Sequence, residues 1–202
     1  MGISQTVIRR LPSYLHYLRQ LPDETVNVSA TAIAGALGLG DVQVRKDLAL
    51  ICGGGKPKIG YDRLSLINSL ETRLGYKDKK LAVIAGAGKL GSAFLEFKGF
   101  EENGLNIVAA FDNDISKVGY SDSGKYIYPM SDFCDFCKTE HVLIGVITVP
   151  WQAAQSVCDM MSRSGIKAIW NFAPVKLEAP DDILIQNENL ASSLALLSSH
   201  LT

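Results

Sequence analysis

Apolar residues in the first 75 positions recur at the three- and four-residue spacing of helices. Residues 4–20 are predicted to form one helix on the positions of Ile8, Leu11, Tyr14, Leu15 and Leu18. Ser4 is the expected N-cap of this helix. Pro12 has no backbone N–H and moves the expected start of the helix toward Leu11.

A helix-turn-helix pattern follows this first helix. A second helix is predicted to open within residues 28–34, with Ser29 as its cap, and to end at Gly38 and Gly40. A third helix is predicted to begin with Asp41 as its cap. Two short helices joined by a glycine turn are typical of DNA-binding modules.

Polar and basic positions gather on the third helix and on the glycine-rich segment 52–61 that follows it. This segment carries two lysines and is typical of the wing of a winged helix. Glutamine can pair with adenine, arginine can pair with guanine, and lysine neutralises phosphate. Any one of these side chains alone would be explained as solvated surface, but their combination favours DNA binding. The expected DNA contacts are Gln43, Arg45, Lys46, Lys56 and Lys58.

Beyond a connecting helix at 62–75, short apolar runs alternate with helical patterns. The runs predict strands at 81–85, 106–111, 141–148, 167–171 and 182–186. The patterns between them predict helices near 90–97, 131–138, 152–164 and 188–201. Such alternation predicts a doubly wound parallel sheet with helices on both faces. The fold class is therefore α/β, a winged helix-turn-helix followed by a Rossmann domain.

The loop after the first of these strands carries a G-x-G-x-x-G pattern with a carboxylate about twenty residues later. Gly86 permits the tight turn, Gly88 lets a pyrophosphate approach the backbone, and Gly91 lets the helix pack against the strand. Asp112 can accept hydrogen bonds from a ribose 2′-hydroxyl, and its charge would repel a 2′-phosphate. The expected cofactor is therefore NAD, as NAD+ or NADH, rather than NADP.

Ligands of doubly wound sheets bind outside the carboxyl ends of the strands, so two further loops are expected to face the dinucleotide. One contains Thr148, Val149 and Pro150, and the other contains Asn171. For each of these residues a role in turn structure is an equal alternative. With the fingerprint loop, the remaining expected cofactor contacts are Ala87, Lys89 and Leu90.

Composition and charge narrow the class of protein. Hydrophobic residues make up 47% of the 202 residues and charged residues 20%, which indicates a packed protein rather than a disordered one. No apolar run is long enough to span a membrane and no signal-peptide pattern is present, so a cytoplasmic protein without membrane contact is expected. Residues 1–75 hold nine Lys or Arg against six Asp or Glu, a basic module that favours a polyanionic partner.

The order of several motifs resembles that of one family. They are Val44-Arg45-Lys46-Asp47-Leu48, Gly60-Tyr61, the Gly86–Gly91 loop, Phe111-Asp112-Asn113-Asp114 with Lys117-Val118-Gly119, Ala153-Ala154-Gln155, and Gly165 to Pro174. Together they resemble the Rex family of bacterial redox-sensing transcriptional repressors along essentially the whole chain. The resemblance implies a homodimer that binds operator DNA in the presence of NAD+ and leaves it in the presence of NADH. It implies no chemistry on a substrate.

The resemblance also implies a domain arrangement. Residues 1–76 would be the winged-helix DNA-binding domain, residues 77–187 the Rossmann domain, and residues 188–202 a last helix swapped onto the partner. Leu190, Leu194, Leu197 and Leu201 give this helix an apolar face. Packing on its own domain is the alternative to the swap.

This chain departs from the family at three positions. The family connects cofactor state to the DNA-binding domains through an arginine, a tyrosine and an aspartate, and these positions fall here on His16, Phe97 and Asn189. A His–Asn contact is weaker than a charge-assisted Arg–Asp contact. The sequence therefore predicts either a weak response to NADH or a different polar relay. An arginine common in the family's wing falls on Pro57.

Other chemistry has little support in the sequence. Cys134 and Cys137 form a C-x-x-C motif inside a predicted helix, which favours ordinary reduced cysteines over a redox pair or a metal site. No catalytic residue and no metal ligand set is expected, so the chain is not expected to be an enzyme. The alternatives are an NAD-dependent oxidoreductase with an amino-terminal extension and an acyl-CoA or nucleotide-binding scaffold.

Overall fold

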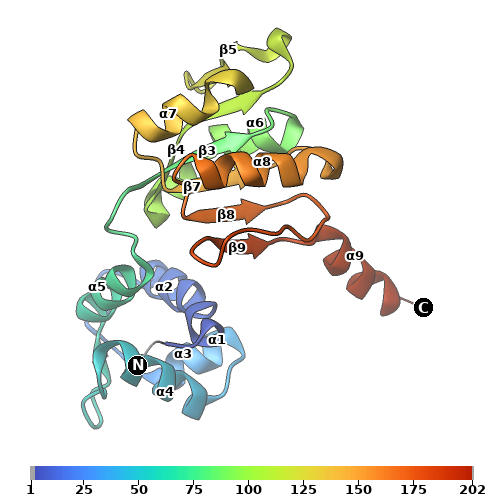
Figure 1. The fold of residues 1–202 in the computed structure, drawn as a ribbon. Helices are drawn as coiled ribbons and strands as arrows, with labels where there is room; N and C mark the ends of the chain where they lie inside the picture. The colour runs from blue at the N-terminus through green and yellow to red at the C-terminus, as the bar shows by residue number, and fades with distance from the viewer. Residues whose placement is uncertain (1–2, 202) are drawn as a thin grey trace. The chain divides into compact units, whose positions relative to one another are not determined.

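A computed structural model describes residues 3–201, which form two compact units that divide between Asp78 and Lys79. The predicted boundary, after residue 76, lies two residues earlier. The helices of the first unit are α1 (Gln5–Ile8), α2 (Leu11–Gln20), α3 (Ala30–Leu37), α4 (Asp41–Cys52) and α5 (Arg63–Leu74), and its strands are β1 (Asn27–Val28) and β2 (Tyr61–Asp62) (Figure 1).

The helix-turn-helix of the first unit is α3 followed by α4, and the hairpin after α4 is the wing. Ser29 Oγ accepts a hydrogen bond from the Ala32 N–H at 3.0 Å, which confirms the predicted cap of α3. Gly38 ends α3 in the left-handed conformation, at a φ of 64°. The wing returns through antiparallel pairing of β1 with β2.

Two local predictions for this unit were wrong in part or in full. Residues 4–20 form two helices and not one, interrupted at Arg9 and Arg10, although Ser4 caps the first and the second begins at Leu11 as Pro12 predicted, since no N–H is required in the first turn. Asp41 is not the cap of α4. Gly40 occupies the cap position, and the Asp41 carboxylate instead accepts a hydrogen bond from Thr31 Oγ1 at 2.8 Å.

The second unit contains a seven-stranded sheet within the described residues, in the order β5-β6-β4-β3-β7-β8-β9. Its strands are β3 (Lys80–Ala85), β4 (Leu105–Asp112), β5 (Gly119–Tyr120), β6 (Tyr126–Pro129), β7 (Ile144–Ile147), β8 (Ala168–Asn171) and β9 (Leu184–Asn187). Its α-helices are α6 (Lys89–Glu96), α7 (Phe133–Thr139), α8 (Trp151–Arg163) and α9 (Leu190–Ser199). Short 3-10 helices lie at Lys98–Asn103, Ile115–Lys117 and Met130–Asp132.

Both faces of the central strand β3 are buried, which explains its continuous apolar sequence. Ala82 and Ile84 pack with Leu95 of α6 on one face. Val83 and Ala85 pack on the other face with residues of α7 and α8, which lie together on one side of the sheet in Figure 1. The predicted doubly wound α/β fold is confirmed.

The edge of the sheet was not fully predicted. Strands β5 and β6 were missed because they are short, and β5 pairs antiparallel to β6 in an otherwise parallel sheet. Strand β7 is shorter than the predicted 141–148, because His141 has a φ of 51° and extended pairing begins only at Ile144. None of the helices in residues 3–201 has the length and apolar character required to cross a membrane.

Candidate functional site

The glycines between β3 and α6 satisfy three different steric demands. Gly86 has a φ of 101°, and a Cβ there would lie 3.0 Å from the backbone of Thr148. A Cβ on Gly91 would overlap the Gly86 carbonyl oxygen, so only glycine lets α6 pack this close to the strand. Gly88, at the N-cap position of α6, differs because a Cβ there would meet no atom within 4 Å. The open space at Gly88 is what a pyrophosphate on a helix N-terminus requires.

Asp112 closes β4 beside this loop. Its Oδ2 accepts hydrogen bonds from the Ala87 N–H at 2.8 Å and from Lys117 Nζ at 2.9 Å, and its Oδ1 accepts one from the Asp114 N–H at 2.8 Å. Burial raises the pKa of Asp112, but these three donors outweigh it and hold the pKa below its ordinary value. A carboxylate has about four acceptor sites, so Oδ1 keeps one for a further donor.

A pocket of about 530 Å³ lies between these elements, within the size range of small-molecule sites. Six residues expected to contact a cofactor line it: Gly86, Gly88, Asp112, Thr148, Val149 and Pro150. Thr148 also fixes the loop, because its hydroxyl donates to the Gly86 carbonyl oxygen at 2.7 Å.

Other expected residues lie outside this lining. Asn171 is fully buried, and its amide is used within its own loop, where Nδ2 donates to the carbonyl oxygens of Ala173 and Val175 and to the side chain of Asn187. Ala87 contributes its backbone N–H to Asp112. Lys89 and Leu90 are exposed on the first turn of α6.

Four residues that sequence reasoning did not assign to the pocket also line it. They are Asn113, Lys117, Met130 and Ala153. The signal for Lys117 was its position five residues after Asp112, which brings its ammonium to the carboxylate across one 3-10 turn. The other three had no chemical signal of their own.

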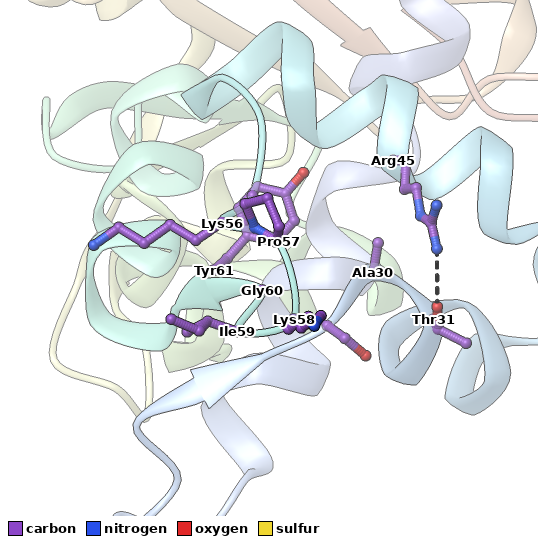
Figure 2. A pocket seen from close by; sticks show the side chains of 11 residues that line it. Ala30, Thr31, Arg45, Lys56, Pro57, Lys58, Ile59, Gly60 and Tyr61 are labelled. Atoms are coloured by element: carbon purple, nitrogen blue, oxygen red, sulfur yellow. Dashed lines mark hydrogen bonds between the residues drawn. The ribbon is translucent and has the colours of Figure 1, made fainter.

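The DNA-facing candidate surface lies in the first unit. Lys56, Lys58 and Arg45 border a pocket of about 390 Å³ between the wing and the start of α3. Figure 2 shows Arg45 reaching from α4 to Thr31 of α3, a contact of 3.5 Å. The Arg45 guanidinium is also 2.9 Å from Asp41, one helical turn earlier.

These basic side chains are accessible to a polyanion. Arg45, Lys46, Lys56 and Lys58 are all exposed, as is Gln43. Lys58 lies at the turn of the wing with a φ of 63°, a conformation uncommon for residues other than glycine. The structure thus brings Arg45, Lys56 and Lys58 around one hollow and places Gln43 and Lys46 on the same helix as Arg45.

The three residues at the family's relay positions each have a local contact. His16 Nε2 lies 2.9 Å from Nε2 of Gln20, one helical turn later. Phe97 is 57% exposed and packs edge-to-face on Phe100. Asn189 caps α9 by accepting a hydrogen bond from the Ser192 N–H at 3.0 Å.

The two cysteines of the C-x-x-C motif differ in exposure, because Cys134 is half-buried and Cys137 is buried. Cys134 and Cys137 lie inside α7, and burial raises the pKa of Cys137 to about 12, which keeps it a thiol. Among residues 3–201, no group of three or more His, Cys, Asp or Glu side chains is placed to hold a metal ion.

Comparison with known proteins agrees with this two-part description. Residues 2–49 match the family model of a putative DNA-binding protein N-terminus, and residues 77–175 match that of a CoA binding domain. The redox-sensing transcriptional repressor Rex of Treponema denticola is 41% identical over 191 residues, which cover 94% of this chain and 91% of that protein.

Solved structures agree along the full chain. A crystal structure of RSP in complex with β-NAD+ and operator DNA superposes with a TM-score of 0.94 at 34% identity, covering 100% of this chain and 93% of that one. A crystal structure of RSP in complex with β-NADH gives a TM-score of 0.89 at 33% identity, with coverage of 100% and 95%. This chain belongs to the Rex family of redox-sensing transcriptional repressors.

Proposed function

We propose that this chain is a transcriptional repressor that binds operator DNA through residues 1–76 and NAD(H) through its Rossmann unit. The observation that carries the proposal is the intact dinucleotide loop, with Asp112 beside it, in the same chain as a winged helix whose basic side chains surround one hollow. Asp112 and Lys117, the ionisable side chains that line the pocket, are paired with each other, and the relatives are repressors, which supports a binding protein and not an enzyme.

The cofactor is NAD+ or NADH. A ribose 2′-hydroxyl can donate to the free acceptor site on Asp112 Oδ1, whereas a 2′-phosphate would be repelled by that carboxylate. The pyrophosphate would lie over Gly88 at the positive end of the α6 dipole. Thr148, Val149 and Pro150, which line the pocket together with Gly86 and Asp112, would contact the bound dinucleotide.

The functional unit is a homodimer. Helix α9 exposes Leu194 and Leu197, and Leu201 follows the end of this helix. Each of the three is at least 64% accessible, and the Leu190 side chain lies outside the described part of the structure. Burial of such an apolar helix face against another protein surface is energetically favourable. A second copy of the chain would cover it, with residues 188–202 packed on the partner.

The response to NADH is weaker in this chain than in the family. His16 offers at most two ring N–H donors in place of the five-donor fork of an arginine, Phe97 has no hydroxyl, and Asn189 has no charge. Charge-assisted hydrogen bonds contribute about 1.5–3 kcal/mol each, and a near-complete switch needs about 5.5 kcal/mol of differential binding. Loss of two charge-assisted hydrogen bonds from the relay would therefore remove most of the differential binding free energy that the switch needs.

The proposal is tested by selecting a duplex from a random DNA pool with the purified chain and measuring its affinity by fluorescence anisotropy. We expect sequence-selective binding, tighter than binding to unselected DNA by at least about 10³-fold. Calorimetric titration should show binding of NAD+ and NADH, and NADH absorbance should stay constant when candidate substrates are added. Turnover of NADH without selective DNA binding would instead support the oxidoreductase alternative.

A further inference from the structure

Arg10 links the start of α2 to the recognition helix α4 through a buried carboxylate. Its Nε and Nη2 donate to Oδ2 and Oδ1 of Asp47 at 2.8 and 2.9 Å, and the Tyr14 hydroxyl donates to the same Oδ2 at 2.7 Å. Asp47 is 3% exposed and Tyr14 is fully buried. The two-pronged contact fixes both the position and the plane of the guanidinium.

The guanidinium also lies beside the side-chain amide of Gln43, one helical turn before Asp47. Asp47 engages Nε and Nη2, so Nη1 is the nitrogen left to donate to this amide. A terminal atom of the Gln43 amide is 3.0 Å from Nε and 3.1 Å from Nη1 of Arg10. Both nitrogens carry donor hydrogens only, so the amide atom that faces them is the oxygen. The covalent geometry of the amide then directs its NH2 group away from Arg10.

We propose that Arg10 is a specificity-determining residue, which fixes Gln43 as a hydrogen-bond donor toward an acceptor on a base edge. Guanine O6 and N7, thymine O4 and adenine N7 are such acceptors in the major groove, and guanine offers two of them. The stronger, two-pronged pairing of glutamine with adenine requires the amide oxygen to face the base edge, whereas here the oxygen is turned toward Arg10. The inference rests on the proposed function, because it assumes that α4 enters DNA.

Arg10 acts through Gln43 and not through attraction of phosphates. Its side chain is only 21% exposed, and its charge is neutralised by Asp47. A change at Arg10 that keeps the charge should therefore leave the salt dependence of DNA binding unchanged while altering which base pair is preferred.

The test measures anisotropy on the selected duplex and on each of its single-base variants, with NAD+ present. Gln43→Met should lower the preference at one base pair by about five- to 150-fold, without equal weakening at the others. Arg10→Lys keeps the positive charge and one hydrogen bond to Asp47 but loses the second bond to Asp47 and the donor that faces Gln43. It should strengthen binding to adenine at the same base pair, because the freed amide can then make the two-pronged pairing, and adding it to Gln43→Met should change nothing further. Arg9→Lys, at the exposed neighbouring arginine, is the matched control.

Gln43→Glu provides a second route if Arg10→Lys impairs folding. Its carboxylate can still accept from Arg10 but has no outward donor, so the preference should be lost as in Gln43→Met. Independent effects of the Arg10 and Gln43 changes, or equal weakening on all sequences, would overturn the inference and leave DNA binding intact. Absence of any sequence preference in the unchanged protein would overturn the proposed function as well.

Discussion

Replacing Asp112 with asparagine tests how the pocket recognises a ribose. In the unchanged chain three donors meet this carboxylate, from Ala87, Asp114 and Lys117, and one acceptor site on Oδ1 remains. Asparagine has a single acceptor oxygen and a donor NH2 group. That oxygen can accept from both the Asp114 N–H and the ribose hydroxyl, but without the negative charge, and the NH2 group would face the donors of Ala87 and Lys117.

Two magnitudes follow from these contacts. Replacement of a charge-assisted bond to the ribose by a neutral one costs about 1–1.5 kcal/mol, which weakens NADH binding by roughly five- to tenfold. A buried donor left without an acceptor costs the fold about 1–3 kcal/mol, so the thermal unfolding temperature should fall as well. Removal of the negative charge beside Lys117 favours a 2′-phosphate, so NADPH binding should weaken less than NADH binding or strengthen.

Calorimetric titration of NADH and NADPH against Asp112→Asn, followed by thermal unfolding without cofactor, measures these effects. Asp114→Asn is the control, because Asp114 is exposed and serves only the short turn at Ser116. The reasoning would be refuted if Asp112→Asn bound NADH as tightly as the unchanged chain, or kept the same preference for NADH over NADPH.

Three further predictions concern other parts of the chain. Gly91→Ala should destabilise the fold by about 1–3 kcal/mol in denaturant unfolding, because its Cβ overlaps the Gly86 carbonyl oxygen, whereas Gly88→Ala should leave stability nearly unchanged and weaken NADH binding. Burial and the bond to Asp47 raise the pKa of Tyr14 to about 12, while an unfolded tyrosine ionises near about 10. Stability should therefore fall as pH rises through that interval, and Tyr14→Phe should lose about 1.5–3 kcal/mol at neutral pH together with its share of the alkaline fall. Lys58→Gln should weaken binding to all DNA sequences alike and reduce the slope of log affinity against log salt by about 1; an unchanged slope would remove Lys58 from the interface.

Local rules predicted the parts of the fold that depend on neighbouring residues. The cap at Ser29, the left-handed glycine at Gly38 and the turn at Gly86 all follow from the backbone conformations that these residue types allow. The buried strands of the sheet were found because burial on both faces leaves a continuous apolar run. The spacing between Gly86 and Asp112 predicted a dinucleotide site because it is the length of one helix-containing crossover between adjacent parallel strands.

Contacts between residues distant in sequence were not predictable. Arg10 and Asp47 are 37 positions apart, and only the folded unit shows that the same guanidinium also fixes Gln43. Sequence reasoning treated Gln43 as a free reader of adenine for that reason. For Asn171 the sequence left a cofactor contact and a role in turn structure equally open, and only the folded unit shows its amide bonded to the carbonyl oxygens of Ala173 and Val175.

The central claim is that this Rex-family chain binds both DNA and NAD(H) while its relay residues His16, Phe97 and Asn189 weaken the coupling between them. Titration of NADH and, separately, NAD+ into the protein on its selected duplex, followed by anisotropy, tests this most directly. We predict that saturating NADH changes the DNA affinity by less than about tenfold relative to NAD+, against the 10⁴-fold scale of a full switch. Complete release of the duplex by NADH alone, with NAD+ leaving it bound, would contradict the account.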